Sequence, residues 1–246
     1  MSVNPYESSD HPSGTGVNFL KWAVIALVAL LFFGLLFSPL RRGGVSEAAR
    51  RNSCMNQMRQ IAIAIKNYEL ANGSLPPAYT VDEQGRRLHS WRTLILPYME
   101  EITLYESIDL TKPWDDPVNA EARNTRAYFY ECSSSDADLT QYVAVVGDGF
   151  AFSGSDRNDS EEFADGEGQT ILFVEAGAKH AVHWMSPEDV DAKTFLQLDE
   201  ATDMNHPSVI LVAFADGHAS WVPSGVSIRT LRAMLTTNGG EEINEE

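Results

Sequence analysis

The chain lacks the residues on which several classes of protein depend. It has only two cysteines in 246 residues, and its 17 glycines are too few for a collagen-like repeat, so disulfide-dense and fibrous scaffolds are excluded. Cations are also scarce, because 18 Lys and Arg stand against 35 Asp and Glu and give a net charge of −17. A protein that binds nucleic acid through its phosphates needs an excess of cations, so we expect no nucleic-acid partner.

Short catalytic motifs are missing as well. The sequence contains no Gly-x-Ser-x-Gly nucleophile motif, no Gly-x-x-x-x-Gly-Lys-Ser/Thr phosphate loop and no Cys-x-x-Cys pair. We therefore predict a protein that is not an enzyme, with no catalytic residues, no cofactor and no metal site. Hydrophobic residues nevertheless make up 43% of the chain, which is enough for a folded domain with a core.

One long apolar segment is present near the N-terminus. The run WAVIALVALLFFGLLF covers residues 22–37, and eleven of its residues are Val, Ile, Leu or Phe. On an insertion scale these residues favour the bilayer by roughly 3–7 kcal/mol. We predict a disordered tail over residues 1–18 and a single, uncleaved transmembrane helix over residues 19–40, because the tail has no basic residue to open a signal peptide.

The orientation of this span has two opposing indications. Arg41, Arg42, Arg50, Arg51 and Arg59 follow it and no Lys or Arg precedes Lys21, so the positive-inside rule favours a cytoplasmic C-terminal side. The cysteines, discussed below, favour the opposite side.

The rest of the chain predicts an α+β domain over residues 44–240, followed by an acidic tail over residues 241–246. Cys54, Met58, Ile61, Ile65 and Tyr68 recur at helical spacing, which indicates a long amphipathic helix from Glu47 to about Ala71. Short helices and a mostly antiparallel sheet should follow, with a tight Asp-Gly turn between the last two strands. The strand candidates are residues 127–131, 142–146, 169–175, 209–214 and 218–222.

Several blocks of this domain resemble a family of prepilin-like (pseudopilin-like) envelope proteins of planctomycete type that carry a domain of unknown function. The helix EAARRNSCMNQMRQIAIAIKNYELANGSLPPAY is similar to the family's opening, and HSWRTLILPYME and KPWDD are similar to its next blocks. The segment VHWMSPED resembles a later block, and His206, nine further residues and Asp216-Gly217 resemble the C-terminal signature. The resemblance implies an envelope location and a pseudopilin-like fold.

The N-terminus departs from that family. Prepilin-like members begin with a Gly-Phe-Thr-Leu-x-Glu site for leader cleavage, whereas here Gly14-Thr15-Gly16-Val17-Asn18 precedes the span and no Glu lies within it. We therefore expect the family's globular domain on a plain membrane anchor, without pilus-style polymerisation.

Cys54 and Cys132 both fall in blocks where the family has a cysteine, so the resemblance suggests a disulfide between them. Two buried thiols are the alternative. A disulfide requires an oxidising compartment, and together with the family's envelope location it favours an extracytoplasmic domain over the arginine count.

Three groups of residues invite a chemical interpretation, and each also has a structural one. His206 and Asp216 lie at opposite ends of a predicted strand, so we expect them not to touch and expect Asp216-Gly217 to form a turn. His180 and His183 would share a metal only on a helix, and packing is favoured. The acidic stretch 148–167 has enough carboxylates to suggest Ca²⁺, although a solvated loop is favoured; its acidic residues include Asp156, Asp159, Glu161, Glu162 and Asp165.

We therefore expect a non-enzymatic, membrane-anchored envelope protein with a structural or interaction role and unidentified protein partners. The alternative is a solute- or calcium-binding receptor domain on the same anchor. A concave pocket lined by tryptophan would favour the receptor, and a filled core around these side chains would count against it; the tryptophans concerned are Trp91, Trp114, Trp184 and Trp221.

Overall fold

The computed structural model describes residues 15–36, 46–132, 139–155, 163–197 and 204–240, and within the first range it describes side chains only at residues 19 and 21–32. The chain divides into two compact units, residues 1–46 and residues 47–246. The predicted tails lie mostly outside the described residues, namely at 1–14 and 241–246.

The first unit contains the helix α1, Thr15–Leu36. It includes most of the predicted span and begins earlier, so residues 15–18 are helical and not part of a disordered tail. A helix extends past its apolar run because each added residue gains a backbone hydrogen bond. Residues 37–40 of the predicted span lie outside the described part. Among the residues that the structure describes, no helix combines the length and the apolar character needed to cross a membrane.

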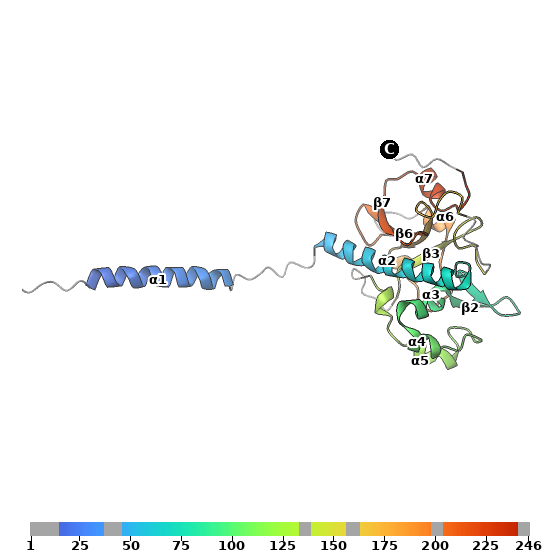
Figure 1. Ribbon diagram of the computed structural model, residues 1–246, viewed down its shortest axis with the longest axis horizontal. Helices are drawn as coiled ribbons and strands as arrows, with labels where there is room; N and C mark the ends of the chain where they lie inside the picture. Colours follow the sequence, from blue (N-terminus) through green and yellow to red (C-terminus); the bar gives the residue numbers. More distant parts are fainter. Residues whose placement is uncertain (1–14, 37–45, 133–138, 156–162, 198–203, 241–246) are drawn as a thin grey trace, which may run out of the picture. The chain divides into compact units, whose positions relative to one another are not determined.

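The second unit is α+β, as predicted, and opens with the long helix α2, Glu47–Asn72. All five residues of the predicted apolar stripe are buried. Gly73, at φ +78°, follows the helix and accepts the left-handed conformation that ends it. Figure 1 shows α2 running across the domain, where it packs against the strands β6, Val209–Phe214, and β7, Ala219–Pro223.

Short elements follow α2. The hairpin β1–β2 turns at Gly85, and Ser90 caps the next helix by accepting a hydrogen bond from the Arg92 amide. The described elements up to residue 130 are β1 Tyr79–Val81, β2 Arg87–Ser90, α3 Trp91–Leu94, η1 Leu96–Met99, α4 Ile102–Glu106, η2 Pro117–Asn119, α5 Ala120–Arg123 and η3 Tyr128–Tyr130.

A five-stranded sheet forms the centre of the domain, in the order β5-β3-β4-β6-β7. Its pairs are antiparallel except for β3 with the two-residue β5, which are parallel. The remaining elements are β3 Tyr142–Val146, β4 Ile171–Glu175, η5 Ala178–His180, β5 Val190–Asp191, α6 Ala192–Phe195, β6 Val209–Phe214, β7 Ala219–Pro223 and α7 Ile228–Ala233.

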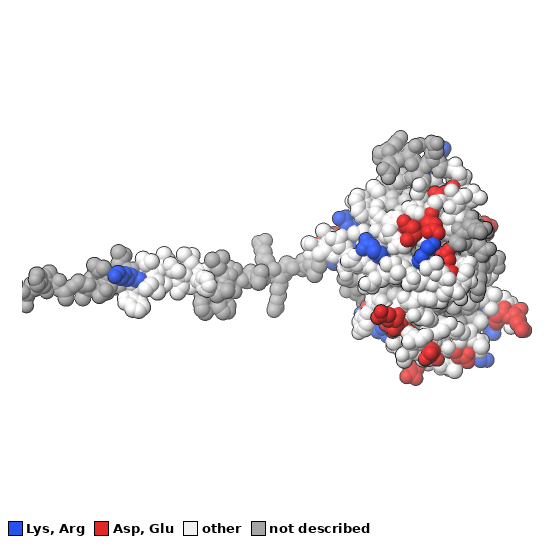
Figure 2. Space-filling model, viewed as in Figure 1, with Lys and Arg blue, Asp and Glu red and all other residues white. Residues whose placement is uncertain are grey.

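The sheet is covered on both faces, which explains its continuous apolar strands. In β6 all six residues are buried: Leu211 and Ala213 pack in the cluster that includes α2, and Ile210 and Val212 pack in a second cluster with α6 and α7. On the face of the domain shown in Figure 2, acidic side chains gather in separate patches with a few basic side chains beside them.

Candidate functional site

A disulfide joins α2 to the segment after η3. Cys54 lies on the inner face of α2, Cys132 follows Glu131, and their Cα atoms are 5.4 Å apart. Both side chains are buried. The two residues are 78 positions apart, so the crosslink stabilises the fold by about 4–5 kcal/mol on the chain-entropy model.

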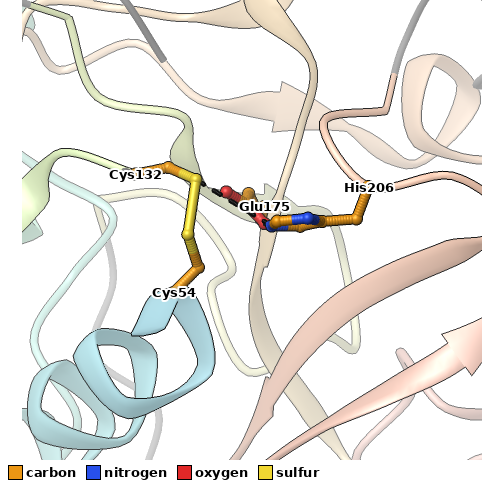
Figure 3. A group of neighbouring side chains, drawn as sticks. All are labelled: Cys54, Cys132, Glu175 and His206. Carbon is orange, nitrogen blue, oxygen red and sulfur yellow. Dashed lines mark hydrogen bonds and ion pairs between the residues drawn. A yellow bond between two sulfur atoms is a disulfide. The ribbon is translucent and has the colours of Figure 1, made fainter. Parts of the chain in front are cut away.

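The ring of His206 lies beside this disulfide and contacts two carboxylates. Its Nε2 is 3.2 Å from Oε2 of Glu175, at the end of β4, and 3.9 Å from Sγ of Cys132. Its Nδ1 is 2.5 Å from Oε1 of Glu47, in the first turn of α2. Figure 3 shows the four side chains that meet here, Cys54, Cys132, Glu175 and His206, which we call the Cys–Glu–His cluster.

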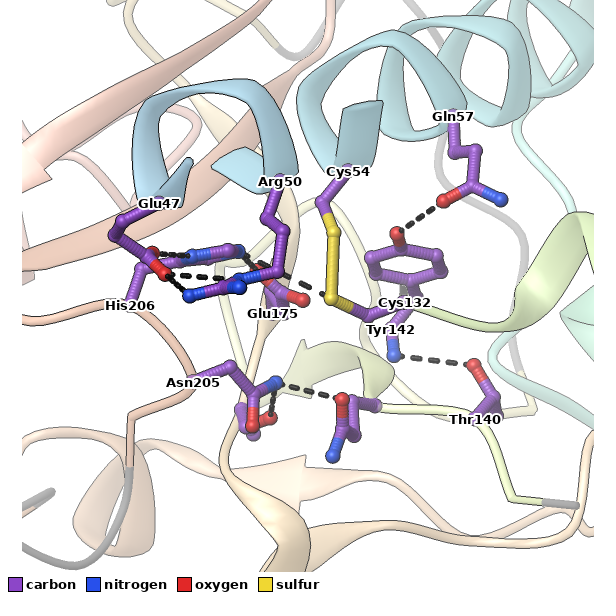
Figure 4. The surroundings of a disulfide bond; sticks show 12 residues. Glu47, Arg50, Cys54, Gln57, Cys132, Thr140, Tyr142, Glu175, Asn205 and His206 are labelled. Carbon is purple, nitrogen blue, oxygen red and sulfur yellow. Dashed lines mark hydrogen bonds and ion pairs between the residues drawn. A yellow bond between two sulfur atoms is a disulfide. The ribbon is translucent and has the colours of Figure 1, made fainter. Parts of the chain in front are cut away.

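Further hydrogen bonds join the polar side chains around the cluster. Arg50 donates from Nη2 to Oε2 of Glu47 at 2.7 Å, and Tyr142 donates from its hydroxyl to Oε1 of Gln57 at 3.1 Å (Figure 4). Asn205 donates from Nδ2 to Oε1 of Gln141 at 2.6 Å. These hydrogen-bonded polar groups lie around the disulfide and His206.

The charges around His206 favour the ionised pair of His206 and Glu47. Burial lowers the pKa of His206, but its hydrogen bonds to Glu175 and Glu47 and their negative charges outweigh burial and raise that pKa above the usual value. The hydrogen bond from His206, opposed in part by burial and aided by Arg50, holds the pKa of Glu47 below its usual value. Glu175 is buried, and its Oε1 has no hydrogen-bond partner among the described residues.

A second buried charge pair has a structural role. Arg92 in α3 donates from Nη1 to Oδ1 of Asp189 at 2.8 Å and donates further hydrogen bonds to the carbonyls of Tyr142, Trp184, Ser186 and Glu188. Burial raises the pKa of Asp189 despite the opposing charge of Arg92. The pair fixes the segment before β5 against α3 and β3.

The structure separates His206 from Asp216. His206 belongs to the cluster above, whereas Asp216 and Gly217 form the turn between β6 and β7, with Gly217 at φ +92°. Oδ1 of Asp216 accepts hydrogen bonds from the amide and from Nδ1 of His218, on its own turn. The prediction of a turn is confirmed.

His180 and His183 do not form a shared metal site. His180 ends η5, and His183 accepts a hydrogen bond at Nδ1 from the Met185 amide. The Nε2 of His183 is therefore protonated and donates to the Arg123 carbonyl at 3.1 Å. Both nitrogens of His183 are occupied, and its ring stacks on Trp114 with centroids 5.0 Å apart, as the packing interpretation expects.

The acidic stretch is described only in part. Asp156, Asp159, Glu161 and Glu162 lie outside the described residues. Asp165 uses its carboxylate to accept hydrogen bonds from the amides of Gly239 and Gly240 at 2.6 and 2.9 Å, so it holds the C-terminal segment.

The four tryptophans differ in their surroundings. Trp91 and Trp184 lie in the core, and Trp221 is exposed on β7. Trp114 lines a cavity of about 500 Å³ together with Arg87, Asp115, His183 and Glu188.

The residues that sequence analysis missed are all charged: Glu47 is part-exposed, and Arg92, Glu175 and Asp189 are buried. A local signal exists for two of them, because Arg92 interrupts the apolar run WRTLIL and Glu175 ends the apolar strand ILFVE. A charge in such a position is buried only with a partner.

Comparison with known families gives a match over part of this domain. A family model described as a protein of unknown function, DUF1559, matches residues 45–159. The match covers α2, Glu47 and both cysteines, and it ends before Glu175 and His206. Searches of curated proteins and of solved structures found no match to the chain.

Proposed function

We propose that this protein is a non-enzymatic, membrane-anchored envelope protein whose α+β domain has a structural or interaction role. The observation that carries the proposal is the surface of α1. Its described Val, Ile, Leu, Phe and Trp side chains are 53–78% exposed: Phe19, Trp22, Val24, Ile25, Leu27, Val28, Leu30, Leu31 and Phe32. Apolar side chains on every side of a helix require a nonpolar environment, and a lipid bilayer supplies one.

The Cys54–Cys132 disulfide supports an extracytoplasmic position for the domain, because disulfides persist in oxidising compartments. The arginines after the span favour the other side, so the proposal gives the disulfide more weight. The pseudopilin-like type is supported by the long helix α2 packed on a mostly antiparallel sheet. A net charge of −17 favours partners with a basic surface.

The non-enzymatic role is supported by where the acid–base groups meet. Glu47, Glu175 and His206 converge around a disulfide, and the His206 side chain is only 1% exposed. A substrate would have no open approach to this ring.

The anchor is tested by washing membranes from cells that express the full chain with alkaline carbonate. We expect the protein to stay in the membrane pellet. The double variant L27R/L30R should move to the soluble fraction, because each Arg at the centre of a span costs roughly 2.5–3.5 kcal/mol. The control is L70R, which changes a 77% exposed leucine on α2 and should leave the protein in the pellet. Wild-type protein in the carbonate wash would reject the anchor.

A solute-binding receptor is the second candidate, and the cavity beside Trp114 favours it. An indole stacked on His183, with Arg87 and Glu188 nearby, provides an aromatic wall and charged groups of both signs. Titration with glucose and with free amino acids, followed by tryptophan fluorescence, should then give a saturable change that W114A loses and W221A retains. For the calcium form of this candidate, calorimetric titration with millimolar Ca²⁺ should release or absorb heat.

A further inference from the structure

The Cys–Glu–His cluster brings together four side chains that commonly bind metal ions. One ligand atom from each of Cys54, Cys132, Glu175 and His206 lies within 4.8 Å of every other, and all four residues are buried. They come from α2, from the segment after η3, from the end of β4 and from the loop before β6, and in Figure 3 they point toward one point. Two sulfurs, an imidazole nitrogen and a carboxylate oxygen are a ligand set that suits zinc.

The separations between these atoms are close to those of a tetrahedral zinc site. Bonds of about 2.0–2.3 Å from one ion place neighbouring ligand atoms roughly 3.3–3.8 Å apart. His206 Nε2 is 3.2 Å from Glu175 Oε2 and 3.9 Å from Cys132 Sγ. The two sulfurs, which are bonded to each other, have to move apart.

The groups behind the cluster also match a metal site. Nδ1 of His206 is held by Glu47, which is held in turn by Arg50, so the ring is oriented with Nε2 toward the sulfurs. A carboxylate on the far nitrogen of a histidine is a common way to orient a metal-binding imidazole.

An independent observation points to a ligand. The Glu175 side chain is 1% exposed, and its Oε1 has no hydrogen-bond partner among the described residues. A buried carboxylate oxygen without a partner is costly, and a cation bound between Glu175 and the sulfurs would satisfy it.

We propose that the Cys–Glu–His cluster is a redox-exchangeable metal site, which holds a disulfide when oxidised and binds one Zn²⁺ when reduced. A dithiol reductant transfers two electrons and two protons to the Cys54–Cys132 bond and becomes a cyclic disulfide itself. The two thiols then lose their protons to solvent, as does Nε2 of His206 where it carries one, when the metal binds. The inference goes beyond the proposed function and does not depend on the membrane anchor.

The test uses Co²⁺, whose tetrahedral thiolate complexes absorb visible light strongly. Full-length protein in detergent is reduced with a phosphine, which is then removed without air, and Co²⁺ is titrated in. We expect one Co²⁺ per chain with tetrahedral absorption bands, displaced by Zn²⁺, and no such bands from the oxidised protein. Reduced protein that gives no tetrahedral bands overturns the proposal.

Variants distinguish a specific four-residue metal site from nonspecific metal binding by the two thiols alone. H206A and E175Q should each weaken Co²⁺ binding at least tenfold, and E47Q should weaken it roughly 10–100-fold at unchanged stoichiometry. The matched controls are H218A, a histidine whose side chain is 43% exposed, and E69Q, a buried carboxylate on α2 outside the cluster; both should bind as wild type. Equal binding by H206A, E175Q and the controls would overturn the proposal.

If reduction unfolds the protein, near-UV circular dichroism measures whether metal binding restores its tertiary structure. Metal that restores the near-UV spectrum of the reduced chain supports the site, because ligands from four segments then meet again. A reduced chain that stays unfolded with bound metal overturns it.

Discussion

Nδ1 of His206 lies 2.5 Å from Oε1 of Glu47, which joins the loop before β6 to the first turn of α2 across 159 positions of sequence. The same ring contacts Glu175 and Cys132 through Nε2. A single histidine therefore connects the beginning of the long helix, the end of β4 and the disulfide. His206 is one of the residues to which the family resemblance drew attention, and it lies at the centre of the Cys–Glu–His cluster.

The Glu47–His206 contact should contribute measurably to stability. E47Q removes the charge from this hydrogen bond, and because the Glu47 side chain is 39% exposed we expect a loss of only about 1 kcal/mol in the free energy of unfolding. Urea unfolding measures it. E83Q, at an exposed glutamate in the β1–β2 turn, is the control and should change stability by less than about 0.5 kcal/mol. Equal effects of E47Q and E83Q would contradict the structural role of the contact.

The disulfide should matter more than any single hydrogen bond. We expect the double variant C54S/C132S to lose roughly 2–5 kcal/mol of unfolding free energy in the absence of metal, because the unfolded chain regains its freedom. Peptide mapping without reductant, after thiol blocking at lysis, shows directly whether the bond forms in the cell. Free thiols at both positions would remove this support for an extracytoplasmic domain.

The buried Arg92 should be indispensable to the fold. R92M leaves Asp189 uncompensated in the core, together with the four carbonyls to which Arg92 donates, and we expect a loss of about 3–5 kcal/mol. Because those carbonyls stay unsatisfied, the double variant R92M/D189L should recover only part of this loss. Thermal unfolding of both variants measures whether R92M is less stable than R92M/D189L, as we expect. Full recovery in the double variant would show that the carbonyl contacts contribute little.

Acidification should destabilise the domain through His89 and His183. Burial lowers the pKa of both side chains in the folded protein, so the unfolded chain binds more protons at acidic pH. Their contribution is present above about pH 6.5, the unfolded value, and is lost as the pH falls below it. The raised pKa of His206 has the opposite effect on stability, because the folded protein then binds the proton more tightly than the unfolded chain. The contribution of His89 is therefore measured as the difference between wild type and a His89 variant. Between pH 7.5 and pH 5.5, H89Q should lose less unfolding free energy than wild type, as measured by urea unfolding. Equal losses in the two proteins would reject the assignment of this pH dependence to His89.

Periodic segments of the fold could be predicted from the sequence. The stripe from Cys54 to Tyr68 predicts α2, and the strands at 142–146 and 209–214 are found within the predicted bounds. The strand predicted at 127–131 is wrong, because residues 128–130 form the 3-10 helix η3. There Tyr130 is buried and donates from its hydroxyl to the Arg92 carbonyl, a distant contact that outweighs local β propensity. The two-residue β5 was missed, because it exists only through its pairing with β3.

The site was less accessible to sequence analysis than the fold. Glu47, Cys132, Glu175 and His206 lie far apart in the chain, and no spacing rule brings them together. The resemblance drew attention to both cysteines and to His206, but Glu175 is recognisable only as a charge at the end of an apolar strand, and Glu47 only as an acidic residue in the first turn of a helix.

The central claim is that an N-terminal anchor holds this domain outside the cytoplasm, and the accessibility of a C-terminal epitope tag tests it most directly. Spheroplasts of cells that express the full chain with a tag after Glu246 are treated with an added protease. The account predicts that the tag is removed while a cytoplasmic marker protein remains intact. A tag that survives until the spheroplasts are lysed would contradict it.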